Sequence, residues 1–349
     1  MYLCSVSEIP GIDAPKVSDW FARNIPGATP PLGFELVAGG RSNLTFRVTD
    51  SAGHDWALRR PPVGPLLPTA HNMEREHRII AALASRTDLP VPPPVGFCGD
   101  EQVTGAAFYV MAFVPGRVLH DVDAARAMPE PERRVAGETL VDTLADVHAV
   151  DPDRAGLGDL ARRDGYIVRQ LERWHGQYEK SKRREVPLLD EVYEGLLETA
   201  PPQTETRLVH GDFGLDNAIF DDGGALVAVL DWELCTLGDP LADMGLLRVR
   251  WVDPEDDAFG RSPLPPAAGG FPRWSEIVER YAARSGRDLA GLDFFVAYSY
   301  WRAATMLEAT RARHASGAAA GATDFKGFGD EYVVFLLETA RSALAAARG

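Results

Sequence analysis

The sequence predicts an α+β fold in two parts: a small antiparallel β-sheet at the N-terminal end and a larger, mainly helical part after it. Three observations lead to this prediction. Short apolar runs separated by turn residues fill the N-terminal part, as expected for strands. From about residue 129 onward, apolar residues recur at helical spacing. Between these regions Pro115-Gly116 interrupts both patterns, so we expect one domain at 1–115 and another at 116–349.

The N-terminal part is predicted to hold short strands and one helix, after a Pro-containing lead-in segment. The helix runs from Met73 to Ser85. Asn72 suits its N-cap, and Glu74 and Glu76 suit its positive first turn. Pro90–Pro94 cannot be helical and is expected to be an extended connector. The strands are expected at 34–37, 44–48, 56–59, 95–98 and 107–113.

The C-terminal part is predicted to be helical apart from a strand at 207–209 and a hairpin. The hairpin joins 217–220 to 226–230 around Asp221-Asp222-Gly223-Gly224, which is a strong turn signal. Residues 254–270 are rich in Pro and Gly and are expected to form a loop. Helices are expected at 135–147, 167–178, 188–197, 241–250, 272–285, 293–311 and 330–347.

Composition narrows the class of protein. The 349 residues carry 36 Lys and Arg against 51 Asp and Glu, a net charge of −15, which argues against non-specific nucleic-acid binding. No apolar run approaches the roughly 20 residues that cross a bilayer, and residues 1–15 lack the features of a signal peptide. Cys4, Cys98 and Cys235 are too scattered for a disulfide framework or a zinc site. We therefore expect a cytoplasmic protein without a membrane or nucleic-acid partner.

The residues that carry chemistry lie within His210-Gly211-Asp212-Phe213-Gly214-Leu215-Asp216-Asn217. An Asp followed five positions later by Asn, in a loop after a strand, resembles the catalytic loop of protein kinases. There the Asp orients the attacking hydroxyl and the Asn binds magnesium. Asp231 closes the predicted hairpin and supplies a second oxygen ligand of the kind that a hard cation prefers. The ordered motifs predict phosphoryl transfer, with Asp212 catalytic and Asn217 and Asp231 as metal ligands.

These motifs are similar to those of the aminoglycoside phosphotransferase and choline-kinase-like family, a branch of the protein-kinase-like fold. The string from Leu230-Asp231-Trp232-Glu233-Leu234 to Gly238-Asp239-Pro240-Leu241-Ala242-Asp243 narrows the resemblance to the kinase-like region of acyl-CoA dehydrogenase family members 10 and 11. The resemblance spans Phe34 to Ala345 and is most specific at 208–243. It implies a bilobal fold, a functional link to an acyl-CoA dehydrogenase, and ATP and Mg²⁺ as cofactors, with GTP left open.

The resemblance assigns phosphate contacts in the N-terminal part. The turn with Gly39, Gly40, Ser42 and Asn43 would cover the phosphates with backbone and side-chain donors, although a plain hairpin turn is an equal alternative. The third strand would carry a phosphate-binding Lys, and Arg59 takes that place here. The exchange alters the geometry, because a guanidinium is a planar fork and not a point charge.

Two further sets of nucleotide contacts follow from the same resemblance. Glu76, with Glu74 as the alternative, would pair with the arginine on the third strand. Residues 109–116 would form the hinge between the lobes, where Met111 would wall the base pocket. Ala112 and Val114 would bond the base through their backbone groups. A role in core packing explains a methionine at position 111 equally well.

The acceptor site is less well defined by the sequence. Two predicted helices combine arginine with aromatic residues and could line an anion-binding pocket, namely Arg169, Arg173 and Trp174 on one and Tyr300, Trp301 and Arg302 on the other. A solvated face over core aromatics is the alternative. Glu233 could reach a second magnesium ion or the substrate. Structural roles are expected for His148, His210, Asp239 and Asp243, with Asp239 and Pro240 at the N-cap and first position of a helix.

Together these features predict a small-molecule kinase that transfers the γ-phosphoryl group of ATP to a hydroxyl of a metabolite. The branch that the chain resembles implies a hydroxy acid or hydroxyacyl-CoA as the acceptor, which an arginine-lined pocket would suit. An aminoglycoside is the alternative acceptor. A pseudokinase that binds nucleotide or acyl-CoA without turnover also stays open, because Arg59 replaces the usual Lys. The sequence leaves the oligomeric state undetermined.

Overall fold

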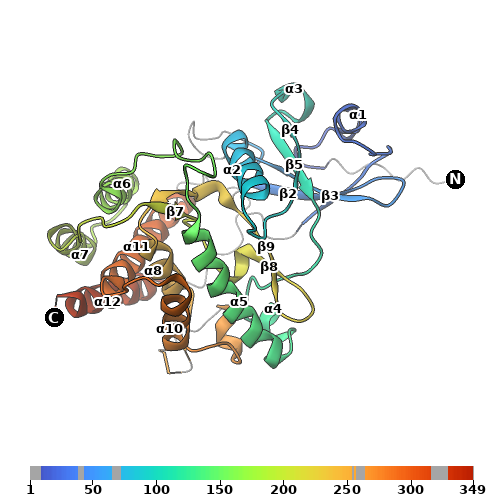
Figure 1. Ribbon diagram of the computed structural model, residues 1–349. Coiled ribbons are helices and arrows are strands. Elements are labelled where there is room, and N and C mark those ends of the chain that lie inside the picture. The colour runs from blue at the N-terminus through green and yellow to red at the C-terminus, as the bar shows by residue number, and fades with distance from the viewer. Residues whose placement is uncertain are drawn as a thin grey trace. The chain divides into compact units, whose positions relative to one another are not determined.

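The computed structural model describes residues 9–37, 43–64, 72–253, 255–256, 264–315 and 329–348 of the chain (Figure 1). The chain divides into two compact units. The first contains the residues up to Gly116 together with Val227–Glu233, and the second contains Arg117–Leu226 and the residues from Leu234 onward. The predicted α+β class is confirmed, because a sheet dominates the first unit and helices dominate the second. The segment Val227–Glu233 belongs to the first unit, although the sequence analysis assigned it to the C-terminal part.

The first unit is built on one 5-stranded antiparallel sheet. Its register pairs Phe46 with Leu58, and Leu58 with Val110, across the centre. All three side chains are fully buried, so one face of three adjacent strands supplies the core. In sheet order the strands are β1 (Gly33–Leu36), β2 (Leu44–Thr49), β3 (Asp55–Arg60), β5 (Phe108–Ala112) and β4 (Pro94–Cys98).

Helix α2 (Met73–Arg86) packs against β4 and β5, as the sequence predicts. The side chain of Asn72 caps it by accepting a hydrogen bond from the Arg75 N–H at 2.9 Å. Its buried residues Ile79, Ile80 and Leu83 follow the helical spacing of the prediction. The short helix α3 (Glu101–Thr104) precedes β5.

Helix α1 (Ala14–Asn24) is missing from the sequence-based prediction. The Asp13 side chain caps it by accepting from the Lys16 N–H at 3.2 Å. Pro15 stands in its first turn, where the missing N–H of proline costs nothing. Trp20 packs edge-on against Phe108 with 4.9 Å between ring centroids, so the apolar face of α1 completes the core of the first unit. Pro15 thus marks the start of a helix, whereas the sequence-based prediction placed it in an irregular N-terminal segment.

The second unit is a helical assembly around α11 (Leu292–Ala315). This helix contacts α6, α7, α8 and α12, and its residues Ala297, Trp301 and Ala304 are fully buried. A helix covered on several sides needs apolar residues on more than one stripe. The other helices are α4 (Val122–Arg126), α5 (Glu130–Ala149), α6 (Tyr166–Ser181), α7 (Pro187–Glu198), α8 (Leu241–Val249), α10 (Trp274–Ser285) and α12 (Asp330–Ala347).

Short strands and single-turn helices fill the rest of the described chain. The strands are β6 (Arg117–Val118), β7 (Arg207–Val209), β8 (Ala218–Phe220), β9 (Leu226–Val229) and β10 (Thr236–Gly238). The turns are η1 (Leu215–Asn217), η2 (Trp232–Leu234) and η3 (Pro265–Ala268). Strand β10 was not predicted; it pairs antiparallel with β7, with Thr236 opposite Val209.

Two helix starts differ from the prediction. Helix α5 begins at Glu130 and not at Val135, because Pro131 occupies its first turn and polar residues continue the helix beyond the apolar stripe. Helix α8 has Pro240 at its N-cap, one position later than expected. Asp239 still contributes, since its Oδ1 accepts from the Leu241 N–H at 3.0 Å. Among the helices described, none is long and apolar enough to span a membrane.

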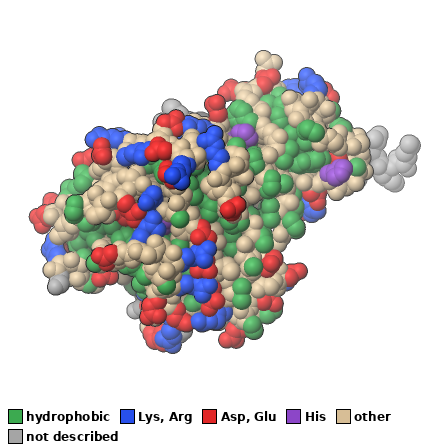
Figure 2. All heavy atoms as spheres, viewed as in Figure 1, with side chains coloured by type: hydrophobic (Ala, Val, Ile, Leu, Met, Phe, Trp, Pro, Cys, Tyr) green, Lys and Arg blue, Asp and Glu red, His purple; other side chains and the backbone are tan. Residues whose placement is uncertain are grey.

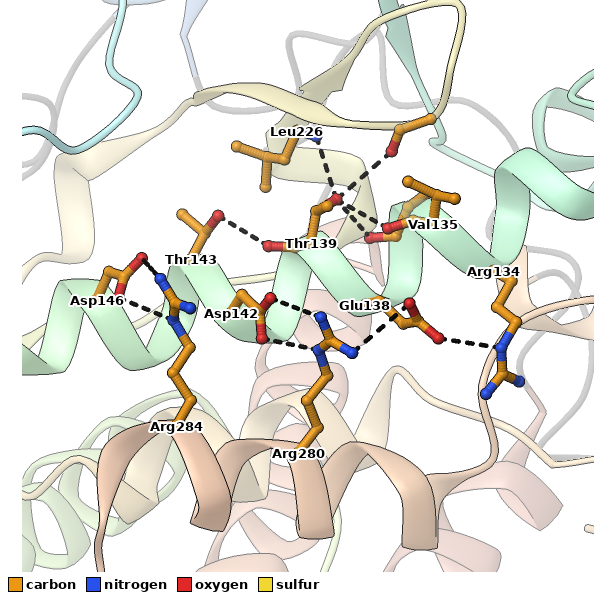
Figure 3. Close-up of polar contacts among 12 residues, drawn as sticks. Arg134, Val135, Glu138, Thr139, Asp142, Thr143, Asp146, Leu226, Arg280 and Arg284 are labelled. Carbon is orange, nitrogen blue, oxygen red and sulfur yellow. Dashed lines mark hydrogen bonds and ion pairs between the residues drawn. The ribbon is translucent and has the colours of Figure 1, made fainter.

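Exposed ion pairs join α5 to α10 (Figure 3). Arg280 donates from two nitrogens to Asp142, each at 2.7 Å, and Arg284 donates to Asp146 at 3.0 and 2.7 Å. Figure 2 shows positive and negative side chains alternating along this face. We call these four residues the α5–α10 ladder. Exposed pairs contribute only about 0.2–1 kcal/mol each, so the ladder adds little stability.

Candidate active site

The candidate catalytic loop follows β7 in the second unit and ends in η1. Gly211 turns the chain with φ +81°, and a Cβ there would lie 2.8 Å from the carbonyl oxygen of Leu234. Only glycine fits both the left-handed backbone and this close approach. The turn presents Asp212, whose side chain is 28% exposed, two residues after the buried His210.

Asp243 holds the start of this loop from helix α8. Its carboxylate accepts from the His210 N–H at 2.7 Å and from the Gly211 N–H at 2.8 Å, and His148 Nε2 lies 3.2 Å away. The Tyr281 hydroxyl lies 2.7 Å from His148 Nδ1. Burial acts to raise the pKa of Asp243, but these hydrogen bonds and the nearby histidines hold it below its ordinary value. The structural roles expected for these polar residues agree with this network.

The carboxylate of Asp212 is held from two sides. Asn217 Nδ2 donates to Asp212 Oδ2 at 2.9 Å and to the Asp212 carbonyl at 2.8 Å. Arg250 Nη2 donates to the other carboxylate oxygen, Oδ1. Burial opposes ionisation, but the charges of Arg250 and Arg302, with smaller contributions from His210 and Asn217, lower the pKa of Asp212. The side chain is therefore an oriented, ionised hydrogen-bond acceptor.

The two side chains that the sequence assigns to magnesium each keep an oxygen atom without a described hydrogen-bond donor. Because Asn217 uses its nitrogen toward Asp212, its Oδ1 accepts no hydrogen bond from any residue that the structure describes. In the first unit, Asp231 Oδ1 accepts from Arg59 Nη2 at 2.6 Å, whereas Oδ2 has no such donor among the described residues. A carboxamide and a carboxylate oxygen are ligands that Mg²⁺ prefers.

Arg59 and Glu76 form a buried ion pair in the first unit. Arg59 Nε lies 3.2 Å from Glu76 Oε1, and the two side chains are 11% and 1% exposed. Burial raises the pKa of Glu76, and the charge of Arg59 opposes that rise. The geometry selects Glu76 over Glu74 as the partner of the strand arginine. Asp231 completes the group with φ +62°, a left-handed conformation that costs energy outside glycine.

The nucleotide contacts expected from the sequence fall into three groups. Gly39, Gly40 and Ser42 lie outside the described residues. Asn43 is 1% exposed and donates from Nδ2 to Glu233 Oε2 at 2.9 Å, so these two residues hold each other within the first unit. The hinge residues Met111, Ala112 and Val114 follow one another at the end of β5. There Met111 is buried and the Ala112 N–H donates to Pro93 at 2.8 Å.

Among the acceptor residues expected from the sequence, Arg302 contacts the catalytic loop. Arg302 Nη2 donates to the Gly211 carbonyl at 3.2 Å, and its guanidinium lies 4.8 Å from the centroid of the Trp174 ring. Arg173 also lies over that ring, at 5.3 Å. Arg169 Nη2 donates to the Arg162 carbonyl at 2.7 Å.

Trp301 does not line a pocket as expected. It is fully buried and donates from Nε1 to the Leu189 carbonyl at 3.0 Å, so its surface is used by the core between α11 and α7. The helical spacing of the aromatic residues gave no way to distinguish this core position from a pocket wall.

Arg250 is a contact of Asp212 that sequence reasoning missed. It follows the last residue of α8 and contacts Asp212 across 38 positions of the sequence. No motif links the two, because the contact depends on how α8 packs beside the catalytic loop. A charged residue at the end of an apolar helix was the only available signal, and such residues are common at helix C-termini.

The site and fold define a class of protein. An ionised carboxylate on a loop after a strand, a carboxamide five residues later, and an arginine–glutamate pair in a sheet unit are the parts of a kinase-like phosphotransferase. The chain belongs to the phosphotransferase enzyme family, whose model matches residues 33–295. The resemblance stated from the motifs is thereby confirmed.

Individual relatives agree with this assignment. Acyl-CoA dehydrogenase family member 11 of Gallus gallus is 36% identical over 295 residues, 82% of this chain and 37% of that protein. The chain thus spans little more than a third of that relative. A crystal structure from Ralstonia eutropha, provisionally described as an aminoglycoside phosphotransferase, is 31% identical with a TM-score of 0.76, and the match covers 96% of this chain and 98% of that one.

A more distant neighbour shows the fold alone. Spectinomycin phosphotransferase, solved with ADP and spectinomycin, is 11% identical with a TM-score of 0.62, and the match covers 95% of this chain and 98% of that one.

Proposed function

We propose that the protein is an ATP-dependent kinase that phosphorylates a hydroxyl group of a small metabolite. The observation that carries the proposal is the state of Asp212: an ionised carboxylate, fixed by Asn217 and Arg250, and partly open to solvent. Phosphoryl transfer needs an acceptor of this kind to orient the attacking hydroxyl. The nucleotide found in the spectinomycin phosphotransferase structure supports ADP or ATP as the other ligand.

In the proposed reaction the acceptor hydroxyl donates a hydrogen bond to Asp212. Its oxygen attacks the γ-phosphorus, the bond to the β–γ bridging oxygen breaks, and ADP leaves. The hydroxyl proton passes to the Asp212 carboxylate. Asn217 and Asp231 would hold the magnesium ion, which neutralises charge on the phosphates when it is bound. Arg59, anchored by Glu76, would contribute positive charge to the nucleotide site.

The charges around Asp212 favour a neutral or anionic acceptor over a polycationic aminoglycoside. Asp216 carries the nearby carboxylate that a cationic acceptor could use, and Arg250 already pairs with it at 3.1 Å. Arg302 adds a buried positive charge beside Gly211. These observations, with the acyl-CoA dehydrogenase names of the relatives, support a hydroxy acid or hydroxyacyl-CoA as the acceptor.

A turnover assay tests the proposal. ADP release would be followed with Mg²⁺-ATP and, in separate reactions, hydroxy acids, hydroxyacyl-CoAs, aminoglycosides and choline. We expect release with a hydroxylated anion and none from Asp212→Asn. Stabilisation by Mg²⁺-ATP without ADP release for any acceptor would favour the pseudokinase alternative.

A further inference from the structure

Arg250 is a solvent-accessible cation in direct contact with Asp212. Its side chain is 26% exposed; Nη2 donates to Asp212 Oδ1, and Nη1 donates to Asp216 Oδ1 at 3.1 Å. A planar guanidinium matches the geometry of a carboxylate better than a lysine does. We propose that Arg250 is the anchor for a carboxylate group of the acceptor, which replaces Asp216 when the acceptor binds. This inference rests on the proposed kinase function.

Asp216 is the partner that an incoming carboxylate can replace. Its side chain is 43% exposed, and water screens an ion pair of that kind, so its loss costs little. Asp212 is held more firmly, because its carboxylate is less exposed and also accepts from Asn217 Nδ2 at 2.9 Å. An anion arriving at Arg250 would therefore take the place of Asp216 and leave the bond to Asp212 intact.

The exchange would position the hydroxyl that reacts. One guanidinium would then bridge the acceptor carboxylate and the Asp212 carboxylate. A hydroxyl a few bonds from the acceptor carboxylate would be held within reach of Asp212, which reduces the entropy that must be lost on the way to the transition state. A substrate without the anion would lack this second point of attachment. The acceptor class is therefore a short hydroxy carboxylate.

Gly214 supplies a second observation at the same place. A Cβ at this position would lie 2.7 Å from Asp216 Oδ1 and 3.0 Å from Arg250 Nη1. The backbone of Gly214 is extended, with φ −178°, which any residue can adopt. Space, and not backbone conformation, therefore favours glycine here. The bare backbone is what lets a carboxylate meet Nη1 at this place.

The buried charge of Arg302 makes the binding of an anion near the loop favourable. Its side chain is 8% exposed, and within the described part of the chain no carboxylate forms an ion pair with it and its Nε has no hydrogen-bond partner. Its charge acts on the Asp212 carboxylate at longer range, as the lowered pKa of Asp212 shows, so the burial of this cation is only partly compensated. An anion bound at Arg250 would add negative charge near the loop that both arginines contact, which offsets part of the remaining cost of burial.

The alternative is that Arg250 only braces the loop. Binding of two matched probes separates the two roles: 3-hydroxybutyrate and 1,3-butanediol share the same secondary hydroxyl, but only the first carries a carboxylate. Calorimetry would be done with the whole chain, magnesium and a non-hydrolysable ATP analogue. The variants are Arg250→Met, Arg250→Lys and Asp216→Asn. Arg280→Met, from the α5–α10 ladder, is the control for loss of an ion-paired arginine.

The wild type is expected to prefer the hydroxy acid. Arg250→Met should weaken hydroxy-acid binding by about 10- to 100-fold, as for the loss of a charge-assisted hydrogen-bonding pair. The diol should lose less, because it loses only the support that Arg250 gives to Asp212. Arg250→Lys should recover part of the affinity. Asp216→Asn should tighten hydroxy-acid binding, because it removes the competing carboxylate, and a misfolded variant could not give that result.

Three results would contradict the proposal that Arg250 anchors the acceptor carboxylate. These are equal affinity of the wild type for the two probes, equal losses of affinity for both probes in Arg250→Met, and weaker binding of the hydroxy acid in Asp216→Asn. Failure of the proposed function looks different. If the preference for the hydroxy acid depends on Arg250 but no ADP is released from ATP, the carboxylate anchor is supported and the kinase function is contradicted.

Discussion

Arginine–carboxylate pairs occur in two regions of the second unit, and they differ in how many carboxylates share one arginine. In the α5–α10 ladder, Arg280 and Arg284 each place two nitrogens on a single carboxylate (Figure 3). At the catalytic loop, Arg250 divides its nitrogens between Asp212 and Asp216, and Arg302 donates to a backbone carbonyl. In the ladder, two nitrogens of each arginine bind one aspartate, whereas at the loop Arg250 is shared between two aspartates. We propose that this difference separates a structural contact from a site where one carboxylate can replace another.

The largest effect should come from the carboxylate that the loop arginines surround. Asp212→Asn keeps the shape but removes the charge that orients the hydroxyl, so we expect kcat to fall by about 10²–10⁴-fold. ADP release measures the loss. Asp142→Asn, the matched change in the ladder, should leave kcat unaltered. Comparable losses in both variants would mean that the loop carboxylate has no special role.

The next largest effect should come from the buried anchor of the loop. Asp243→Ala leaves the N–H groups of His210 and Gly211 without their acceptor. Each unsatisfied buried group costs about 1–3 kcal/mol, so unfolding free energy should fall by several kcal/mol. Urea denaturation followed by circular dichroism measures this change. A loss below 1 kcal/mol, well inside the range of an exposed pair, would show that Asp243 does not hold the loop.

A smaller effect should appear as a dependence of stability on pH. His148 is fully buried, and burial lowers its pKa below the ordinary histidine value of about 6.5. The unfolded chain therefore binds the proton more readily, so this residue costs stability as pH falls below about 6.5. His148→Gln removes that contribution, and its unfolding free energy should fall less steeply between pH 7 and pH 5. Parallel slopes for the two proteins would contradict the assignment.

The smallest effect is expected in the ladder itself. Arg280→Met removes an arginine whose side chain is 41% exposed, and such pairs contribute about 0.2–1 kcal/mol. Unfolding free energy should change by no more than this, and turnover should not change. High salt should reduce the difference between variant and wild type further. A loss of activity in this variant would contradict the view that the ladder is structural and the catalytic loop is functional.

Local signals allowed much of this account to be predicted from the sequence. The spacing of Asp212 and Asn217 and the turn before Asp231 lie within short stretches of chain, where periodicity and turn chemistry are informative. The pairing of Arg59 with Glu76 followed from the resemblance to the kinase-like family and not from a local pattern. Their assigned roles in binding nucleotide and metal stay predictions.

The features that could not be predicted from the sequence depend mainly on long-range packing. Arg250 reaches Asp212 only because helix α8 packs beside the loop, and no local pattern encodes that contact. Trp301 has the same chemical character as a pocket residue, yet the helices around α11 bury it completely. Helix α1 escaped prediction because Pro15 at a helix start looks like Pro15 in a loop.

The most direct test of the central claim is a phosphorus NMR spectrum of the wild type incubated with Mg²⁺-ATP and a pool of short hydroxy acids. We predict a new phosphomonoester resonance that grows as ADP accumulates and is absent with Asp212→Asn. Bound but unconsumed ATP in the wild type, or the same product from the Asp212→Asn variant, would contradict the assignment of Asp212 as the residue that orients the attacking hydroxyl.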